Sequence, residues 1–379
     1  MTLNFPTSPS VNDTYTYNGT TFVWDGEKWD ASTPILVNTA NIVDDAVTGD
    51  KLADDIDIAT TGDVQTASLN GGPLAGLRNV LINGDFRVWQ RGNTFNTAGN
   101  TLNAYTADRW YGNAASTNVT KESIISGGVQ QLPGFTNGIK ADTGLNVRYG
   151  IELDSPATNS QFAKNSQWTL SYWSNQPFTA VNAGFTDGVG NLGAAVYFGN
   201  TALPTAIETN GGWTRYSKTI TIDKDATLTN KCLTWLFVNT NSVSHTMTGV
   251  QFEPGPVATP FEHRPIATEL ALCQRYYFSN ISGRPYQFGS GTASTTWMSA
   301  SAALPQPMRA TPSVVLYGEG GASSVGFLGV DGLNLVVASG TSFRLGNSAS
   351  STESIPVQAQ SSTTSVYGFW FGLTADAEL

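Results

Sequence analysis

Acidic side chains are the first candidates for chemistry in this sequence, because two carboxylates at a suitable separation in a cleft can hydrolyse a glycosidic bond. After Pro265 they are few, and they fall in expected turns, in an expected helix or within the last four residues: Glu269, Glu319, Asp331, Glu353, Asp376 and Glu378. Between residues 78 and 265 they are more numerous and include Asp85, Asp108, Glu152, Asp154, Glu253 and Glu262. We interpret the neighbours Asp108 and Arg109 as a structural ion pair. We therefore expect no catalytic pair after Pro265, whereas the sequence excludes no cleft before it.

Other catalytic patterns are missing from the sequence. It contains no G-x-S-x-G elbow, and its two histidines, His245 and His263, have no evident partners. Nothing matches a phosphate-binding loop or a dinucleotide fingerprint, and no regular repeat indicates a parallel β-helix. We therefore expect a protein that is not an enzyme and that uses no cofactor.

Aromatic side chains indicate a different chemistry, because the apolar face of a pyranose stacks on Trp or Tyr while polar neighbours bond its hydroxyls. Six tryptophans lie in strand-like stretches and are expected in the core: Trp89, Trp110, Trp168, Trp173, Trp213 and Trp235. Tyr286, Phe288 and Trp297 are better candidates for a receptor or glycan contact surface. The alternative for these three is burial between subunits.

The stretch YTYNGTTFVWDGEKW, which starts at Tyr15, contains two turn dipeptides between β-prone residues. Asn18-Gly19 and Asp25-Gly26 both suit two-residue hairpin loops, so the stretch predicts a three-stranded meander in which Phe22 pairs with Tyr15 and with Trp29. The aromatic residues then share one face: Tyr15, Tyr17, Phe22, Trp24 and Trp29. So small a sheet is marginal in water, and we expect its aromatic face to pack on something outside the meander.

Composition favours an all-β protein, because only 13% of the 379 residues are charged while Gly, Thr, Ser and Asn are abundant. The pattern predicts a meander over 1–34 and a short stalk over 35–77. Seven or eight alternating stretches, starting with VLINGDFRVWQRG, predict a jelly-roll β-sandwich over 78–265. A linking helix at about Ala267–Phe278, on which Leu270, Cys273 and Tyr277 share a face, then opens a distal β-sandwich domain over 266–379.

Charge and hydropathy limit the kinds of partner that the chain is expected to bind. A formal net charge of −10 argues against nucleic acid, and no stretch has the apolar length of a membrane span or the pattern of a signal peptide. Cys232 and Cys273 have no metal-ligand spacing, so we expect two buried, reduced thiols.

Several short stretches, in this order along the chain, resemble those of bacteriophage tail fibres and receptor-binding proteins. They are FPTSPSVNDTYTYNGTTFVWDGEKW, IVDDAVTGDKLADDI, NGDFRVWQRG, YTADRWY, VQFEPGPVATPFEHRP, ELALCQRYY, PMRATP and ADAEL. The resemblance implies a homotrimeric fibre in the virion, folded in the host bacterial cytoplasm before assembly. The N-terminal module, including the aromatic face, would dock on a tail, adaptor or baseplate protein, and the distal domain would bind host-surface glycan.

The resemblance to jelly-roll carbohydrate-binding modules also implies a structural calcium ion near the first strand. Its oxygen ligands would be Asp85 and Glu253. The simpler interpretation is that Asp85 caps a turn after Gly84.

The sequence thus predicts a phage tail fibre that attaches the virion to lipopolysaccharide or capsule without cleaving it. Two other functions stay open. One is a short tailspike enzyme that hydrolyses the surface polysaccharide, and the other is a purely structural collar, neck or baseplate protein.

Overall fold

A computed structural model describes residues 4–31, 77–96, 104–112, 118–153, 162–190, 196–226, 230–241, 243–280, 286–293, 298–317, 325–331, 334–340, 342–345, 351–360 and 366–378. The chain divides into two compact units, residues 1–65 and 66–379, and each is described by itself. The predicted stalk over 35–77 lies, apart from Leu77, outside the described residues.

The first unit contains the predicted three-stranded antiparallel meander, β1 (Thr14–Tyr17), β2 (Thr20–Trp24) and β3 (Trp29–Ala31). Tyr15 pairs with Phe22 as predicted, but Phe22 pairs with Ala31 and it is Trp24 that lies opposite Trp29.

The predicted second loop was wrong because it holds four residues, Asp25–Lys28. The Asp25 carboxylate accepts 2.8 Å hydrogen bonds from the backbone N–H groups of Glu27 and Lys28, which closes the longer turn. The strand alternation still places Tyr15, Tyr17, Phe22, Trp24 and Trp29 on one face.

Phe5 packs on this aromatic face. Its ring centroid lies 5.5 Å from that of Tyr15, 5.1 Å from that of Phe22 and 5.3 Å from that of Trp29. These rings are all half-buried rather than buried. The face therefore contacts a residue outside the meander, as expected, and that residue comes from the chain itself.

The second unit opens with a β-sandwich of two antiparallel sheets. The seven-stranded sheet has the order β15 (Thr205–Asn210), β16 (Trp213–Thr221), β12 (Gln167–Ser174), β18 (His245–Pro254), β10 (Asn137–Ala141), β7 (Asn118–Ser123) and β4 (Thr94–Asn96). The six-stranded sheet has the order β14 (Val196–Tyr197), β13 (Ala180–Thr186), β17 (Cys232–Val238), β11 (Asn146–Glu152), β6 (Trp110–Gly112) and β5 (Ala104–Tyr105). A small hairpin, β8 (Ile125–Ser126) and β9 (Val129–Gln130), stands apart. The strands outnumber the seven or eight predicted because many are too short to show a period of two.

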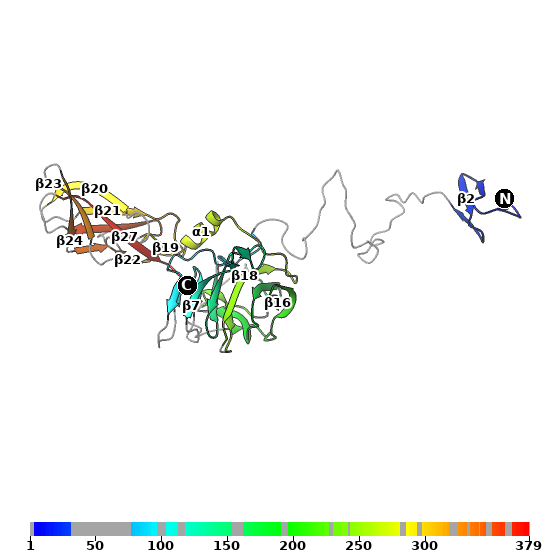
Figure 1. Cartoon of the computed structure of the whole chain (residues 1–379), viewed down its shortest axis with the longest axis horizontal. Coiled ribbons are helices and arrows are strands. Elements are labelled where there is room, and N and C mark those ends of the chain that lie inside the picture. The colour runs from blue at the N-terminus through cyan, green and yellow to red at the C-terminus, as the bar shows by residue number, and fades with distance from the viewer. Residues whose placement is uncertain are drawn as a thin grey trace. The chain divides into compact units, whose positions relative to one another are not determined.

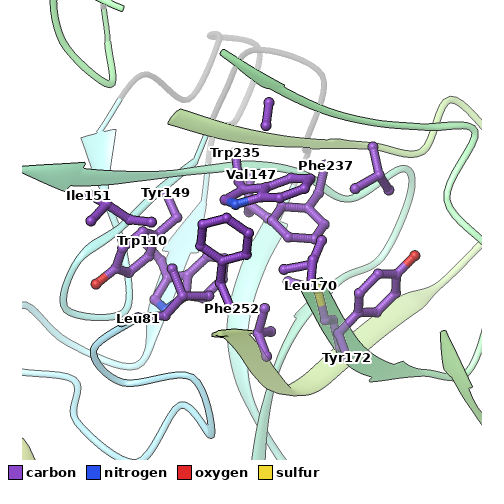
Figure 2. Close-up of a cluster of buried hydrophobic side chains, with 14 of the residues drawn as sticks. Leu81, Trp110, Val147, Tyr149, Ile151, Leu170, Tyr172, Trp235, Phe237 and Phe252 are labelled. Atoms are coloured by element: carbon purple, nitrogen blue, oxygen red, sulfur yellow. The ribbon is translucent and has the colours of Figure 1, made fainter. Parts of the chain in front are cut away.

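Alternating residues of both sheets form the main core. Leu170 and Tyr172 of β12 meet Trp235 and Phe237 of β17 there (Figure 2). Trp168 of β12 belongs to the same core. Of the six tryptophans expected in the core, Trp213 is half-buried and the others are at most 9% exposed. The expectation is confirmed for those five.

The stretch that was expected to form the first strand, residues 79–92, is irregular instead. Asn83 and Phe86 have φ angles of +59° and +54°, which interrupt a strand. The Asn83 side chain donates to the carbonyls of Val88 (2.8 Å) and Asp108 (3.0 Å) and accepts from the N–H of Val88 (2.9 Å). These side-chain bonds replace the ladder that a strand would make.

The helix α1 (Ile266–Gln274) is shorter than predicted, because Tyr277 belongs to the strand β19 (Tyr277–Ser279) that pairs with residues 374–376. Its buried face carries Glu269 and Cys273. The Glu269 carboxylate accepts from the N–H of Asn83 and lies 3.3 Å from the Arg264 guanidinium. Both cysteines are free and buried, as expected.

A second, smaller β-sandwich follows. In its larger sheet β27 (Val366–Asp376), drawn in red in Figure 1, pairs with β19, β20 (Tyr286–Ala293), β22 (Ser313–Tyr317) and β23 (Val325–Asp331), and β23 pairs with β24 (Asn334–Gly340). The other sheet has the order β21 (Met298–Ala303), β26 (Ser354–Gln360) and β25 (Ser342–Leu345). Residues of both sheets, including Ala302, Ile355 and Leu373, form its core. The all-β fold class with one short helix is confirmed.

Two arginines of the first sandwich hold the end of β27. Arg109 is 1% exposed and pairs with Glu378, and its guanidinium carbon lies 3.5 Å from the ring centroid of Tyr276. Arg91 contacts Asp376 at 3.1 Å and Glu378 at 3.4 Å.

The predicted pairing of Asp108 with Arg109 was therefore wrong. Asp108 accepts from the backbone and side chain of Gln90 and lies 3.7 Å from Arg91. Burial raises the pKa of Asp108 to about 6.

We predict that Glu378→Ala destabilises the second unit by about 3–5 kcal/mol, because it leaves the buried Arg109 charge unpaired. Glu353, which is exposed, supplies the control Glu353→Ala. Thermal unfolding of both variants, followed by tryptophan fluorescence, measures the difference. Equal midpoints for the two variants would refute the role of this ion pair.

Candidate functional site

A second apolar cluster covers the outer face of the seven-stranded sheet. Trp173 is the residue of β12 that follows Tyr172, so it points away from the main core and packs with Ile124, Leu132 and Phe135. Trp213 and Phe261 pack against this cluster and are half-buried.

A pocket of about 400 Å³ opens above this cluster, within the range of roughly 300–1,000 Å³ that small-molecule sites occupy. It is lined by Leu132, Pro133, Phe135, Trp173, Glu208, Asn210, Arg215, Pro260, Phe261 and His263. Three segments supply its walls: the loop over 132–135, the β15–β16 hairpin and the segment over 260–263. We take this pocket as the candidate site.

One wall of the pocket is aromatic. The ring centroids of Phe135, Phe261 and His263 lie 4.9–5.3 Å from one another. Gly134, with φ +88°, permits this approach, because a Cβ at that position would lie 3.1 Å from the His263 ring. Phe261 is half-buried and His263 is exposed, so both can contact a ligand.

Buried hydrogen bonds hold the segment over 259–263 on the sheet. Glu253, which is fully buried, accepts from the N–H of Thr259 (2.9 Å), from its hydroxyl (2.5 Å) and from the amide of Gln251 (2.8 Å). The Gln251 side-chain oxygen accepts from the N–H of Glu262 at 2.8 Å. We call these bonds the Glu253 lock. They set the position of Phe261 and His263.

The predicted calcium ligands Asp85 and Glu253 already have protein partners. Asp85 lies 2.5 Å from the Arg87 guanidinium, and Glu253 is bonded in its lock. Calcium requires six to eight oxygen ligands, and no group of three or more acidic, His or Cys side chains suited to a metal occurs in the described parts of the chain. The two residues do not fit a shared calcium site, and we carry that hypothesis no further.

Arg215 forms the polar wall of the pocket together with Glu208 and Asn210. Its Nη2 donates to the carbonyl of Thr259 and, at 3.2 Å, to the hydroxyl of Ser171, so the guanidinium is anchored to the sheet. Burial lowers the pKa of Arg215. The Nη1 atom lies 3.9 Å from a Glu208 oxygen, beyond hydrogen-bonding distance.

His245 has partners that the sequence did not reveal. Its Nε2 lies 2.7 Å from the Ser174 hydroxyl, and its Nδ1 contacts the Asn239 amide. This Ser-His-Asn arrangement is wrong for nucleophilic catalysis. The Asn239 N–H must donate to Nδ1, so the ring proton sits on Nε2 and points at the hydroxyl. Ser174 and His245 are also fully buried, so this group is structural.

Of the predicted contact residues, Tyr286 and Phe288 lie in β20 opposite Phe371 and Phe369 of β27. Their side chains, and all of Trp297, fall outside the described residues. The distal contact surface therefore stays a prediction.

The pocket was missed because its residues are spread over 132–263 and no spacing links them. The signal that could have found part of it is FEHRP, where an aromatic residue and a histidine follow directly after Pro260.

Within the described residues, no helix combines the length and the apolar character that crossing a bilayer requires.

We predict that His245 makes stability depend on pH. Burial lowers its pKa to about 3, while the unfolded chain binds this proton near the ordinary value of about 6.5. Its neutral form is favoured in the fold, so stability is unaffected above about pH 6.5 and is lost as the pH falls towards 3. At pH 5 the loss is about 2 kcal/mol.

The variant His245→Gln should lack this loss, although it is less stable at neutral pH. Comparing the unfolding free energies of the two proteins at pH 7.5 and pH 5 separates His245 from groups such as Asp108. If both proteins lose the same unfolding free energy between pH 7.5 and pH 5, His245 is not the group responsible.

No protein-family model and no curated protein matches the chain. Solved structures similar to part of it include the CBM22-1 xylan-binding domain from Paenibacillus barcinonensis Xyn10C (11% identity, covering 50% of this chain and 100% of that one, TM-score 0.28). Another is TmCBM61 in complex with β-1,4-galactotriose (12% identity, covering 47% of this chain and 99% of that one, TM-score 0.25). A third is the enzymatically active domain of bacteriophage CBA120 tailspike protein 4, with 12% identity and a TM-score of 0.29. The match covers 46% of this chain but only 21% of the tailspike chain. At these identities and TM-scores the likeness is one of β-sandwich fold, and it assigns no ligand and no activity.

Proposed function

We propose that the chain binds a glycan in the pocket on the outer face of the seven-stranded sheet, and that it does so as an attachment protein of a bacteriophage particle. The observation that carries glycan binding is the composition of this pocket. Phe261 and His263 supply an aromatic wall, and Glu208, Asn210 and Arg215 supply a polar wall.

Sugars need both kinds of wall. The C–H face of a pyranose ring packs on an aromatic ring, and its hydroxyls require donors and acceptors in fixed directions. The anchored Arg215 guanidinium supplies donors, and Glu208 supplies acceptors. The Glu253 lock preorganises the aromatic wall, which lowers the entropic cost of binding.

Binding without cleavage suits this pocket better than hydrolysis. A glycosidase requires two carboxyl groups across the bond that it cleaves, and Glu208 is the one carboxylate among the residues that line the pocket. This supports a non-catalytic role at this site.

The place in the virion rests on the resemblance of the motif series to phage tail fibres. In this proposal three chains form a fibre, the aromatic face of the first unit docks on a tail, adaptor or baseplate protein, and the pocket binds lipopolysaccharide or capsule of the host. Three equivalent sites per fibre would raise a weak single-site affinity through avidity.

We predict that Phe261→Ala weakens glycan binding about tenfold, which corresponds to about 1.4 kcal/mol of stacking and apolar contact. The measurement is saturation-transfer NMR and titration of the full chain with oligosaccharides released from bacterial lipopolysaccharides and capsules.

The matched control is Tyr197→Ala, because Tyr197 is an aromatic residue, 42% exposed on β14 of the other sheet, and does not line the pocket. Should Phe261→Ala bind normally while Tyr286→Ala or Phe288→Ala loses binding, the site lies in the distal domain instead.

We also predict that Trp24→Ala or Trp29→Ala lowers incorporation of the protein into phage particles and leaves glycan binding by the purified chain unchanged. Each change removes part of the aromatic docking face. Thr16→Ala, on the opposite face of β1, is the control. Quantifying the chain in purified particles tests this, and normal incorporation of both tryptophan variants would remove the docking role.

A further inference from the structure

We infer that the pocket selects an uncharged sugar unit with two adjacent hydroxyls, which insert between Arg215 and Glu208. This inference rests on the proposed glycan-binding function and names the class of sugar for the same site.

The β15–β16 hairpin brings the two charged residues together. Gly211 and Gly212, both at positive φ, form its two-residue turn, and Asn210 pairs with Trp213. The register then shifts between Ala206 and Glu208. Counted from the turn, the regular register places Glu208 directly opposite Arg215, and the extra residue of the β-bulge, Ile207, lies beyond this pair. The hairpin register thus aims a carboxylate at the polar wall of the pocket.

The pair is left open. Its closest N···O distance is 3.9 Å, whereas a charge-assisted hydrogen bond spans about 2.7–2.9 Å. The Arg215 side chain is 12% exposed and is anchored through Nη2, so it cannot move to close the gap. The Glu208 side chain is 54% exposed and is the adjustable partner. The pocket therefore offers a fixed donor beside an adjustable acceptor.

A hydroxyl group both donates and accepts, which a carboxylate and an ammonium group do not. Of two adjacent hydroxyls on a pyranose, one can accept from Nη1 of Arg215 while the other donates to Glu208. The Asn210 amide lies on the same wall and can bond either hydroxyl. The ring then presents its C–H face to Phe261 and His263.

The charges of the pocket disfavour binding of an acidic sugar. Glu208 and Arg215 offset each other within the pocket, and the whole chain carries a net charge of −10. A sugar carboxylate that approaches Arg215 must also approach Glu208, and like charges at close range repel. A neutral sugar meets no such repulsion, and its binding should change little with salt.

The test compares oligogalactosides with oligogalacturonides of the same length, titrated into the full chain and followed by the indole N–H signals of Trp173 and Trp213. We expect the neutral series to bind at least tenfold more tightly at low salt. In Glu208→Gln, an isosteric change at an exposed side chain, this preference should fall at least fivefold. Glu122→Gln, a half-exposed glutamate of β7 outside the pocket lining, should keep the preference.

The outcomes separate the two claims. If oligogalacturonides bind as tightly as oligogalactosides, or if Glu208→Gln keeps the full preference, the inference is wrong and glycan binding in the pocket stands. If neither series, nor the bacterial oligosaccharides used above, shifts the indole signals, the proposed function fails and the inference with it.

Discussion

The candidate site depends on one buried carboxylate. Glu253 lies on the outer face of the seven-stranded sheet, fully buried, and accepts two hydrogen bonds from Thr259 and one from Gln251. A buried carboxylate without such partners would cost several kcal/mol. The chain therefore has to turn back over the sheet after β18, and this turn carries Phe261 and His263 to the pocket. Without this turn, Phe261 and His263 would not line the pocket, and Arg215 would lose the Thr259 carbonyl as a hydrogen-bond acceptor.

Three other acidic groups connect parts of the second unit in the same way. Glu262 accepts from the N–H of Asn79, Glu269 from that of Asn83, and Glu378 pairs with Arg109. Each bond joins segments that are far apart in sequence. Four of the carboxylates that first suggested hydrolysis, Glu253, Glu262, Glu269 and Glu378, thus hold the fold together. The carboxylate that lines the pocket, Glu208, is a different one and comes from an edge strand.

Much of the fold could be predicted because its causes are local. Alternation in β12 and β17 and the Asn18-Gly19 turn each act over a few residues, and the corresponding strands are present. The errors arose where a distant or side-chain partner decides the backbone. Asn83 bonds to Asp108 and breaks an expected strand, Tyr277 leaves the expected helix to pair with Asp376, and Asp25 extends a turn by two residues.

The site could not be predicted for the same reason. Its polar wall requires Glu208 and Arg215 to pair across the β15–β16 hairpin, its aromatic wall requires the Glu253 lock, and its floor is a tryptophan on the outer face of β12. None of these is visible as a spacing in the sequence, because each depends on which strands become neighbours. The tryptophans did indicate a core correctly, and Trp173 belongs to the smaller one beneath the pocket.

The most direct test of the account is a crystal structure of the full chain with a neutral oligosaccharide that it binds. We expect one pyranose in the pocket, with its face against Phe261 and two adjacent hydroxyls between Arg215 and Glu208. A sugar bound instead on the distal sandwich, with the pocket closed by a neighbouring side chain, would contradict it.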